Sequence, residues 1–346
     1  MSLLKRVALG FTLLLLVLVG VIAWKLRSRA EAIPDQLPEI NAAEADPAAM
    51  VIPGGTSGLP DLKIADLRGK TAYIVVEDRE SIQSRESTSL QRALNRWVYP
   101  PDVVGYQIGD VDGFALLASK IEEFVVLMRS EMRIPLYMDY QGAFMKTFKL
   151  PRGHVGIVVL GPDGDVLIRR SGKADDAFLE QLRTTLKASE PAPPPAPQFK
   201  LGDVDNAACA GKACMFVFLH EPVKRSDIPG IKGGFDGDVT ASGMQGRKPA
   251  VRLAGLAAAA DEKLDDSKTL AVLVGATEGL DLKKWKQLLE APEARALFEI
   301  PADQSAVVVI DKEGRVAVRE LGAPQFYKFG RISDIIGVDL GDHTEP

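Results

Sequence analysis

Cysteine and histidine have the widest range of chemistry among the side chains of this chain, and both are scarce. Cys209 and Cys214 have four residues between them, in Cys-Ala-Gly-Lys-Ala-Cys. The three histidines are scattered, at His154, His220 and His343. A structural zinc site needs about four ligands and a catalytic one about three, so these residues form no local set. The sequence therefore predicts no metal site and no other cofactor.

Residues 230–246 form a second candidate site, because they carry six glycines and precede Arg247-Lys248. Glycine-rich backbone can bind phosphate through its amides, which leaves a small-ligand sensor open as a function. The segment fits neither G-x-x-x-x-G-K-[ST] nor G-x-G-x-x-G, so we interpret it as a surface contact loop. Asp227, Asp236 and Asp238 lack the spacing of a calcium-binding EF-hand. No G-x-S-x-G sequence indicates a hydrolase.

Composition excludes two broad classes of protein. With 46% hydrophobic and 26% charged residues, the chain reads as globular and not as intrinsically disordered. The net charge is −5, and no basic stripe with interleaved aromatic residues is present. We therefore expect no nucleic-acid partner.

The N-terminus predicts a membrane anchor. Residues 7–24 carry no charge and are flanked by basic residues on both sides. As a helix, eighteen residues reach about 27 Å, enough for most of a bilayer core. The alternative is a signal peptide cleaved at Ala30-Glu31-Ala32, but the apolar run exceeds the usual length of a signal. We expect residues 1–6 in the cytoplasm, a transmembrane helix over 7–24, and the remainder in the periplasm of a bacterium, on its inner membrane.

Two stretches of unusual composition divide the rest of the chain. Residues 25–60 are rich in Ala, Pro, Gly and acidic residues and predict a flexible tether. Residues 188–198 contain five prolines and predict a semi-rigid linker. These breaks leave two folded blocks, over 61–187 and 199–342, and a short tail over 343–346.

The two blocks resemble each other at a constant offset of 150 residues. Residues 156–172 read GIVVLGPDGDVLIRRSG, and residues 306–322 read AVVVIDKEGRVAVRELG. The matched pairs are Phe148/Phe298, Pro151/Pro301, Val158/Val308, Val159/Val309, Gly164/Gly314, Val166/Val316, Arg169/Arg319 and Gly172/Gly322. Two matches lie upstream of the strand-turn-strand pattern in the same register, so we predict a duplicated unit.

Each block alternates predicted strands with predicted helices. In the first block we expect strands at 71–77 and 135–139, helices at 83–97, 114–132 and 173–187, and a hairpin at 156–171 that turns on Pro162-Asp163-Gly164. In the second we expect a strand at 213–219, a hairpin at 306–321 and a helix at 326–336. Strand-helix alternation followed by an antiparallel hairpin indicates an α/β fold with a mixed sheet flanked by helices.

Three features together resemble the redoxin branch of the thioredoxin superfamily. They are residues 59–70 leading into an apolar strand, Pro135–Asp139 followed by a short helix, and the hairpin with its closing helix. Gly211-Lys212 opens the second block in the same way. Residues 304–315, QSAVVVIDKEGR, are similar to the YtfJ-like periplasmic proteins. The resemblance implies two tandem thioredoxin-like domains.

The residues that active members of this superfamily use are absent. Their Cys-x-x-Cys pair lies at a helix N-terminus, which lowers the thiol pKa. The matching positions here are Ser81 and Ser84 in the first block and Val223 and Ser226 in the second. The family's cis-proline, just before the hairpin, corresponds to Val155 and Ser305. We therefore expect degenerate sites with no catalytic residue, and His154, beside the first site, to be structural.

Cys209 and Cys214 are predicted at the opposite end of the sheet from those positions. A structural disulfide, two inert thiols and a redox pair all remain open.

The sequence favours a non-enzymatic envelope protein that binds protein partners, as a scaffold, assembly factor or accessory subunit of a membrane complex. The alternatives are a divergent membrane-tethered thiol-disulfide oxidoreductase or peroxide-handling redoxin, and the small-ligand sensor.

Overall fold

The structure is a computed structural model that describes residues 30–40, 46–55, 58–84, 86–129, 132–228, 247–324 and 326–338. Within these ranges no helix is long and apolar enough to cross a membrane. The predicted span 7–24 lies outside the described residues, as do His343 and the whole glycine-rich segment 230–246, with Asp236 and Asp238.

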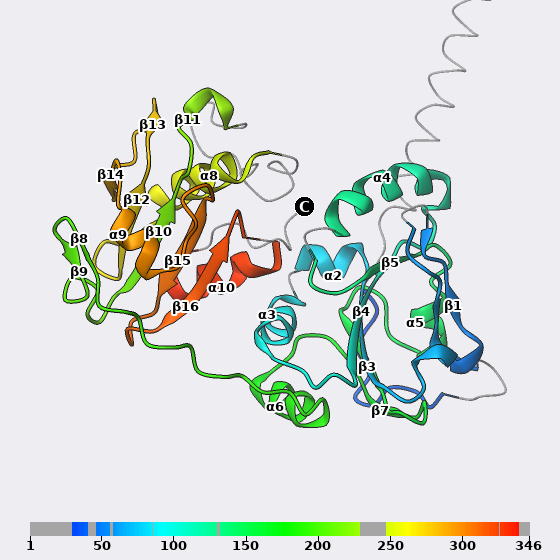
Figure 1. The fold of residues 1–346 in the computed structure, drawn as a ribbon. Helices are drawn as coiled ribbons and strands as arrows, with labels where there is room; N and C mark the ends of the chain where they lie inside the picture. The colour runs from blue at the N-terminus through cyan, green and yellow to red at the C-terminus, as the bar shows by residue number, and fades with distance from the viewer. Residues whose placement is uncertain are drawn as a thin grey trace, which may run out of the picture.

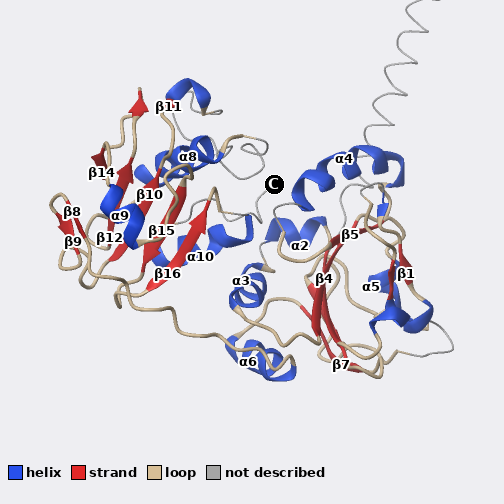
Figure 2. Ribbon diagram, in the orientation of Figure 1, coloured by secondary structure: helices blue, strands red, loops and turns tan. Residues whose placement is uncertain are grey.

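Each half of the chain contains a five-stranded mixed sheet (Figures 1 and 2). The N-terminal sheet has the order β5-β4-β3-β6-β7, and the C-terminal sheet has the order β14-β12-β10-β15-β16. In each sheet the first three strands of the order are parallel to one another. The fourth strand is antiparallel to the third, and the fifth is antiparallel to the fourth. The predicted α/β class is confirmed, and this strand order and connectivity are those of a thioredoxin-like fold.

The N-terminal sheet is formed by β3 (Thr71–Glu77), β4 (Val103–Asp110), β5 (Leu136–Asp139), β6 (Gly156–Leu160) and β7 (Val166–Ser171). Its helices are α2 (Arg79–Ser84), α3 (Thr88–Arg96), α4 (Ala118–Arg129), α5 (Ala143–Thr147) and α6 (Asp176–Thr185), and a small hairpin pairs β1 (Val51–Ile52) with β2 (Leu62–Lys63).

The C-terminal sheet is formed by β10 (Ala213–Phe218), β12 (Thr269–Val274), β14 (Trp285–Leu288), β15 (Ala306–Ile310) and β16 (Val316–Leu321). Its helices are α8 (Pro249–Asp261), α9 (Pro292–Leu297) and α10 (Phe326–Ile336), and its short strands are β8 (Lys200–Leu201), β9 (Val204–Asp205), β11 (Val223–Lys224) and β13 (Thr277–Glu278).

Alternation along the central strand β3 explains the two cores of the N-terminal half. Successive side chains of a strand point to opposite faces. Ile74 and Val76 pack on the face that also holds α5 and the β1–β2 hairpin. Tyr73 and Val75 pack with α3 and α6 on the other face. Because both faces are covered, β3 is apolar throughout until Glu77.

The offset of 150 residues holds in the backbone. Strands β6 and β15 differ by that number at both ends, as do β7 and β16. The hairpin glycines Gly164 and Gly314 both have positive φ, at 87° and 77°, which favours glycine there. Arg169 donates to the carbonyl oxygen of Phe148 at 3.0 Å, and Arg319 donates to that of Phe298 at 2.7 Å. The two hairpins therefore share their turn and their side-chain anchor.

The prediction of a flexible tether over 25–60 is wrong for much of the described part. Met50 and Ile52 are buried in the core of the N-terminal half. The guanidinium of Arg169 holds the backbone carbonyls of Leu37 and Pro38, at 3.2 and 2.6 Å. The sequence pattern does not predict these contacts, because they are made by backbone groups and isolated apolar side chains rather than by a periodic apolar face.

The proline-rich segment 188–198 is attached at both ends. Ser189 and Val98 exchange two backbone hydrogen bonds, at 2.8 and 2.9 Å. The Ala196 amide donates to the Gly314 carbonyl at 2.9 Å. The halves also contact directly, since Arg92 on α3 pairs with Asp334 on α10 at 2.6 Å.

Candidate functional site

Acidic side chains end all three parallel strands of the N-terminal sheet. Glu77, Asp110 and Asp139 are the last residues of β3, β4 and β5, and each is buried. In open α/β sheets ligands bind at the carboxyl ends of the strands. This edge is therefore the first place to look for a function.

Ser81 and Ser84 lie in α2, the short helix that starts at this edge. Ser81 is fully buried, and its hydroxyl accepts from the Asp78 amide at 2.9 Å and donates to the Asp78 carbonyl at 2.9 Å. The Ser84 hydroxyl donates to the Ser81 carbonyl at 3.1 Å. Both hydroxyls therefore bond to main-chain groups of α2 or of the residue directly before it. Ser81 is the third residue of α2 and Ser84 is its last.

The Asp78 carboxylate joins this helix to the loop that precedes β6. One oxygen accepts from the Ser81 amide at 2.9 Å, and the other accepts from the Gly153 amide at 2.5 Å. Farther along, Glu86 accepts from the Val155 amide at 3.2 Å and contacts His154 at 2.8 Å. Two carboxylates therefore hold the loop against the first helix. Sequence reasoning missed both, because their partners lie about 70 residues away.

Val155 lies directly before β6, and Ser305 lies directly before β15, as predicted for the positions that correspond to the family's cis-proline. No peptide bond in the described ranges is cis. Each residue instead joins neighbouring strands through its carbonyl, which accepts from Gly172 in one half and from Gly322 in the other.

Glu77 is a buried carboxyl beside this edge. Its Oε2 accepts hydrogen bonds from Gln91 at 2.7 Å and from Gln107 at 2.6 Å, while Oε1 accepts no hydrogen bond of good geometry from the described residues. Burial raises the pKa of Glu77, and the polar side chains at its carboxylate, Ser87 first and then Gln107 and Gln91, only partly oppose this shift. The signal available in the sequence was an apolar strand ending in two adjacent acids, Glu77-Asp78.

The corresponding edge of the C-terminal half is built differently. Val223 is buried and begins the two-residue strand β11, and Ser226 lies in a 3₁₀ turn at Arg225–Asp227. The expectation that this slot lies at a helix N-terminus is wrong, because the chain continues as a strand paired with β13. Ser305 contacts His220 here, at 2.7 Å from its hydroxyl to Nδ1.

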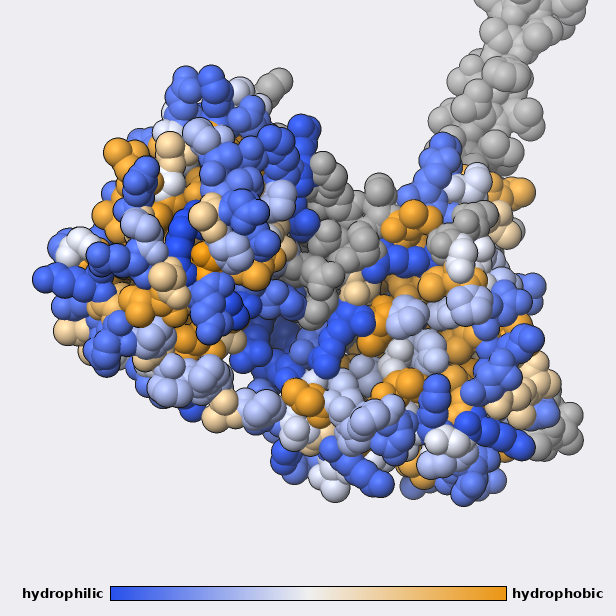
Figure 3. All heavy atoms as spheres, viewed as in Figure 1, coloured by the Kyte–Doolittle hydropathy of each residue, from blue (hydrophilic) through white to orange (hydrophobic). Residues whose placement is uncertain are grey.

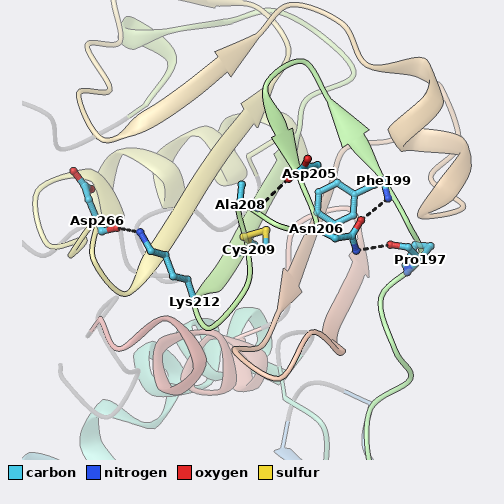
Figure 4. The surroundings of a disulfide bond; sticks show 9 residues. Pro197, Phe199, Asp205, Asn206, Ala208, Cys209, Lys212 and Asp266 are labelled. Carbon is cyan, nitrogen blue, oxygen red and sulfur yellow. Dashed lines mark hydrogen bonds between the residues drawn. A yellow bond between two sulfur atoms is a disulfide. The ribbon is translucent and has the colours of Figure 1, made fainter.

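Cys209 and Cys214 form a disulfide with a Cα–Cα distance of 5.8 Å (Figure 4). Of the alternatives left open by the sequence, the structure contains this one. Cys214 is the second residue of β10, whereas the slot at Val223 follows the other end of the strand. The five steps from Cys214 to Leu219 span roughly 17 Å at about 3.3 Å per residue. The disulfide is therefore distant from the sheet edge at which Val223 and Ser226 lie.

The disulfide is enclosed by the hydrophobic core. Cys209 is 4% exposed, Cys214 is fully buried, and both pack in the cluster that contains Phe199 and Phe216. The Lys212 amide donates to the Cys209 carbonyl at 3.1 Å, which closes the turn between the two cysteines. The environment is that of a structural bridge.

A polar cleft of about 280 Å³ separates the two halves, where Figure 3 shows hydrophilic residues around a hollow. Arg96 and Arg331 line it, and so do Arg319 and Lys328. Arg96 pairs with Glu190 at 3.0 Å, and Lys328 pairs with Glu320 at 2.5 Å. The first pair joins α3 to the proline-rich segment, and the second lies within the C-terminal half. Across the described residues no group of three or more His, Cys, Asp or Glu side chains could hold a metal ion.

Comparisons with known proteins return likenesses of structure alone. No protein-family model matches the chain, and no curated protein matches it. A thioredoxin-like superfamily protein is 22% identical, covers 42% of this chain and 99% of its own, and has a TM-score of 0.32. A thiol-disulfide isomerase from Corynebacterium glutamicum is 18% identical, with coverage of 44% and 95% and a TM-score of 0.31. An exposed lipoprotein thioredoxin of Streptococcus pneumoniae is 13% identical, with coverage of 40% and 97% and a TM-score of 0.30. The thioredoxin-like description of this chain rests on its own strand order.

We predict that Glu77→Gln stabilises the folded chain at alkaline pH. Because the folded-state pKa is raised, the stability contributed by Glu77 is complete below its unfolded pKa and is lost as the pH rises through the folded pKa. Glutamine keeps an oxygen for Gln91 and Gln107 and carries no charge. We expect a gain of roughly 1–3 kcal/mol at pH 8 and almost none near pH 4, measured by urea unfolding.

The control is Glu180→Gln on α6. Its hydrogen bond from Arg183 lowers the pKa of this exposed carboxyl, so the small effect should have the opposite sign. Equal unfolding curves for Glu77→Gln and wild type at pH 8 would show that the buried carboxylate does not destabilise the folded chain.

Proposed function

We propose that this chain is a redox-inactive envelope protein with two thioredoxin-like domains in tandem, over 61–187 and 199–342. We further propose that residues 7–24 anchor it in a bacterial inner membrane with both domains in the periplasm. Its role is to bind other proteins, as a scaffold, assembly factor or accessory subunit of a membrane complex. The likeness of residues 304–315 to the YtfJ-like proteins belongs to this proposal.

The observation that carries the proposal is the separation of thiols from the edge where thioredoxin chemistry takes place. The first helix offers the hydroxyls of Ser81 and Ser84, which are hydrogen-bonded within that helix. A serine hydroxyl gives no thiolate near neutral pH. The only two cysteines of the sequence are bonded to each other in the core at the opposite end of β10. A helix N-terminus activates a thiol only within its first turn.

The second candidate is a divergent thiol-disulfide oxidoreductase that uses Cys209 and Cys214. Several proteins of similar structure, a thiol-disulfide isomerase among them, have an activity of this kind. For this chain it would require the buried bridge to open and reach a substrate. The two candidates therefore differ in one measurable property, turnover that depends on the cysteines.

We predict that the purified chain reduces insulin disulfides no faster than buffer, while an active thioredoxin in the same assay does. The Cys209→Ser/Cys214→Ser variant should keep its biological function and lose stability by less than ~3 kcal/mol, because the bridge closes a very short loop. Turnover above buffer that the double variant abolishes would move the chain to the oxidoreductase class.

A separate prediction concerns attachment and partners. The full chain should stay with bacterial membranes through a high-salt wash and need detergent for release, because about eighteen apolar residues outweigh salt-sensitive contacts. Cross-linking before solubilisation, followed by mass spectrometry, should recover envelope proteins. A variant that lacks residues 7–24 is the control and should leave the membrane fraction. A mature N-terminus at Glu31 or Ile33 would contradict the anchor.

A further inference from the structure

The N-terminal segment crosses the loop that precedes β6, at the edge where α2 begins. The Glu31 amide donates to the Arg152 carbonyl at 2.8 Å, and the Arg152 amide donates to the Glu31 carboxylate at 3.1 Å. One residue of the segment thus satisfies both main-chain groups of Arg152. Without it, an amide and a carbonyl at this edge would need other partners.

Gly153 is required for this approach. A Cβ atom at Gly153 would lie 2.3 Å from the Ala30 Cα, and the φ angle of +85° also disfavours any other residue. Three residues beyond Ala30, Ile33 lies so close to Gly172 that a Cβ atom on Gly172 would be 2.6 Å from the Ile33 Cδ1 atom. Two glycines with positive φ, one before β6 and one after β7, therefore make room for the segment.

His154 fixes the segment from the other side. Its Nε2 contacts the Glu31 carbonyl oxygen at 2.8 Å, and its Nδ1 contacts the Glu86 carboxylate at 2.8 Å. Both partners only accept hydrogen bonds, so the ring satisfies both only when both nitrogens carry protons. The cationic imidazolium is the form that this geometry selects.

Arg169 extends the contact to residues 37 and 38, and the C-terminal half offers an internal comparison. Arg169 uses one guanidinium nitrogen for Phe148 and another for the carbonyls of Leu37 and Pro38. Arg319, its counterpart, uses the corresponding group on the Glu299 carbonyl and carboxylate. In the N-terminal half, the arginine that both hairpins share therefore also binds the N-terminal segment.

We propose that the loop Arg152–His154, together with Glu86, is a binding edge for an extended protein segment that presents a small residue followed by glutamate, and that Ala30-Glu31 of this chain is its resident occupant. The small residue is needed because Gly153 approaches the backbone closely. The glutamate is needed because its carboxylate accepts from Arg152. Binding in trans by a partner segment rests on the proposed function, but the resident contact does not.

The edge is also expected to respond to pH. Burial lowers the pKa of His154, but the hydrogen bonds to Glu86 and the Glu31 carbonyl raise it by more, with a smaller contribution from Asp78. These three are the charged or polar groups that act on the ring. Asp78 lies directly before α2, Glu86 lies after it, and Glu31 belongs to the N-terminal segment. Stability of the resident contact is therefore complete below the free histidine pKa and is lost as the pH rises through the raised value.

Hydrogen exchange of the full chain tests the resident contact. At pH 6, amides of residues 31 and 152 should exchange at least about tenfold more slowly than their intrinsic rates, and this protection should fall in His154→Gln and at pH 9. His220→Gln is the matched control and should leave both amides protected. A histidine NMR titration of the same samples should show the His154 pKa above 6.5 and lowered by Glu86→Gln. Exchange at the intrinsic rate in wild type at pH 6 would overturn the proposal.

A labelled peptide of residues 30–39, AEAIPDQLPE, tests the edge as a site for a partner. Glu31→Pro removes the amide that donates to Arg152 and should free the edge, so this variant should bind the peptide at least about tenfold more tightly than wild type. Glu31→Pro combined with His154→Gln should lose that binding. If hydrogen exchange shows that the segment is released in Glu31→Pro and the peptide still does not bind, the edge is not a site for a partner. That result would leave the resident contact in the wild-type chain unaffected.

Discussion

Each half of this chain is organised around one central strand that is paired on both edges and covered on both faces. β3 and β10 have parallel neighbours on one side and antiparallel neighbours on the other. Such a strand must be apolar along its length, and every polar group that the fold needs is displaced to its ends. The carboxyl end of β3 therefore concentrates Glu77, Asp78 and the first turn of α2. What the protein does there depends on which side chains occupy that end.

At the carboxyl end of β3, the contacts to the neighbouring loop are made by carboxylates, whereas active thioredoxins have cysteine thiols at this edge. Asp78 and Glu86 hold the loop before β6 by its amides, and the serines of α2 bond within their own helix. The result is an edge rich in main-chain hydrogen bonds and without a thiolate. The disulfide, at the amino end of β10, closes a turn in the core of the other half. The proposal that this chain binds protein segments and does not exchange disulfides rests on these two features.

Periodicity and turn chemistry were sufficient for much of the fold. β3 spans 71–77 and α10 spans 326–336 as expected, because both combine a clear apolar pattern with sharp boundaries. The predicted helix at 83–97 is two helices, α2 and α3. α8 was not predicted, because it is alanine-rich and buried on nearly all sides, which leaves no amphipathic stripe to detect. The tether was misjudged because its contacts are long-range.

The correspondence of Ser81, Ser84 and Val155 to the active-site positions of the superfamily stays a prediction. In the structure, Asp78, Glu86 and His154 carry the interactions at this edge. No local pattern marks a carboxylate whose partner amide is 75 residues away. The second slot, at Val223, failed because alignment by spacing assumed a helix where the chain forms β11.

The central claim, that the thiols of this fold are structural and inert, is tested most directly by alkylation of the folded chain. The folded chain would be incubated in a glutathione buffer set to the redox potential of the bacterial periplasm. Its cysteines would then be alkylated over a range of pH, and the labelled fraction would be measured by mass spectrometry. We predict an intact Cys209–Cys214 bridge and no labelling until the chain is unfolded, because both sulfurs lie in the core. Labelling in the folded state with an apparent thiol pKa well below ~8.5 would contradict the account.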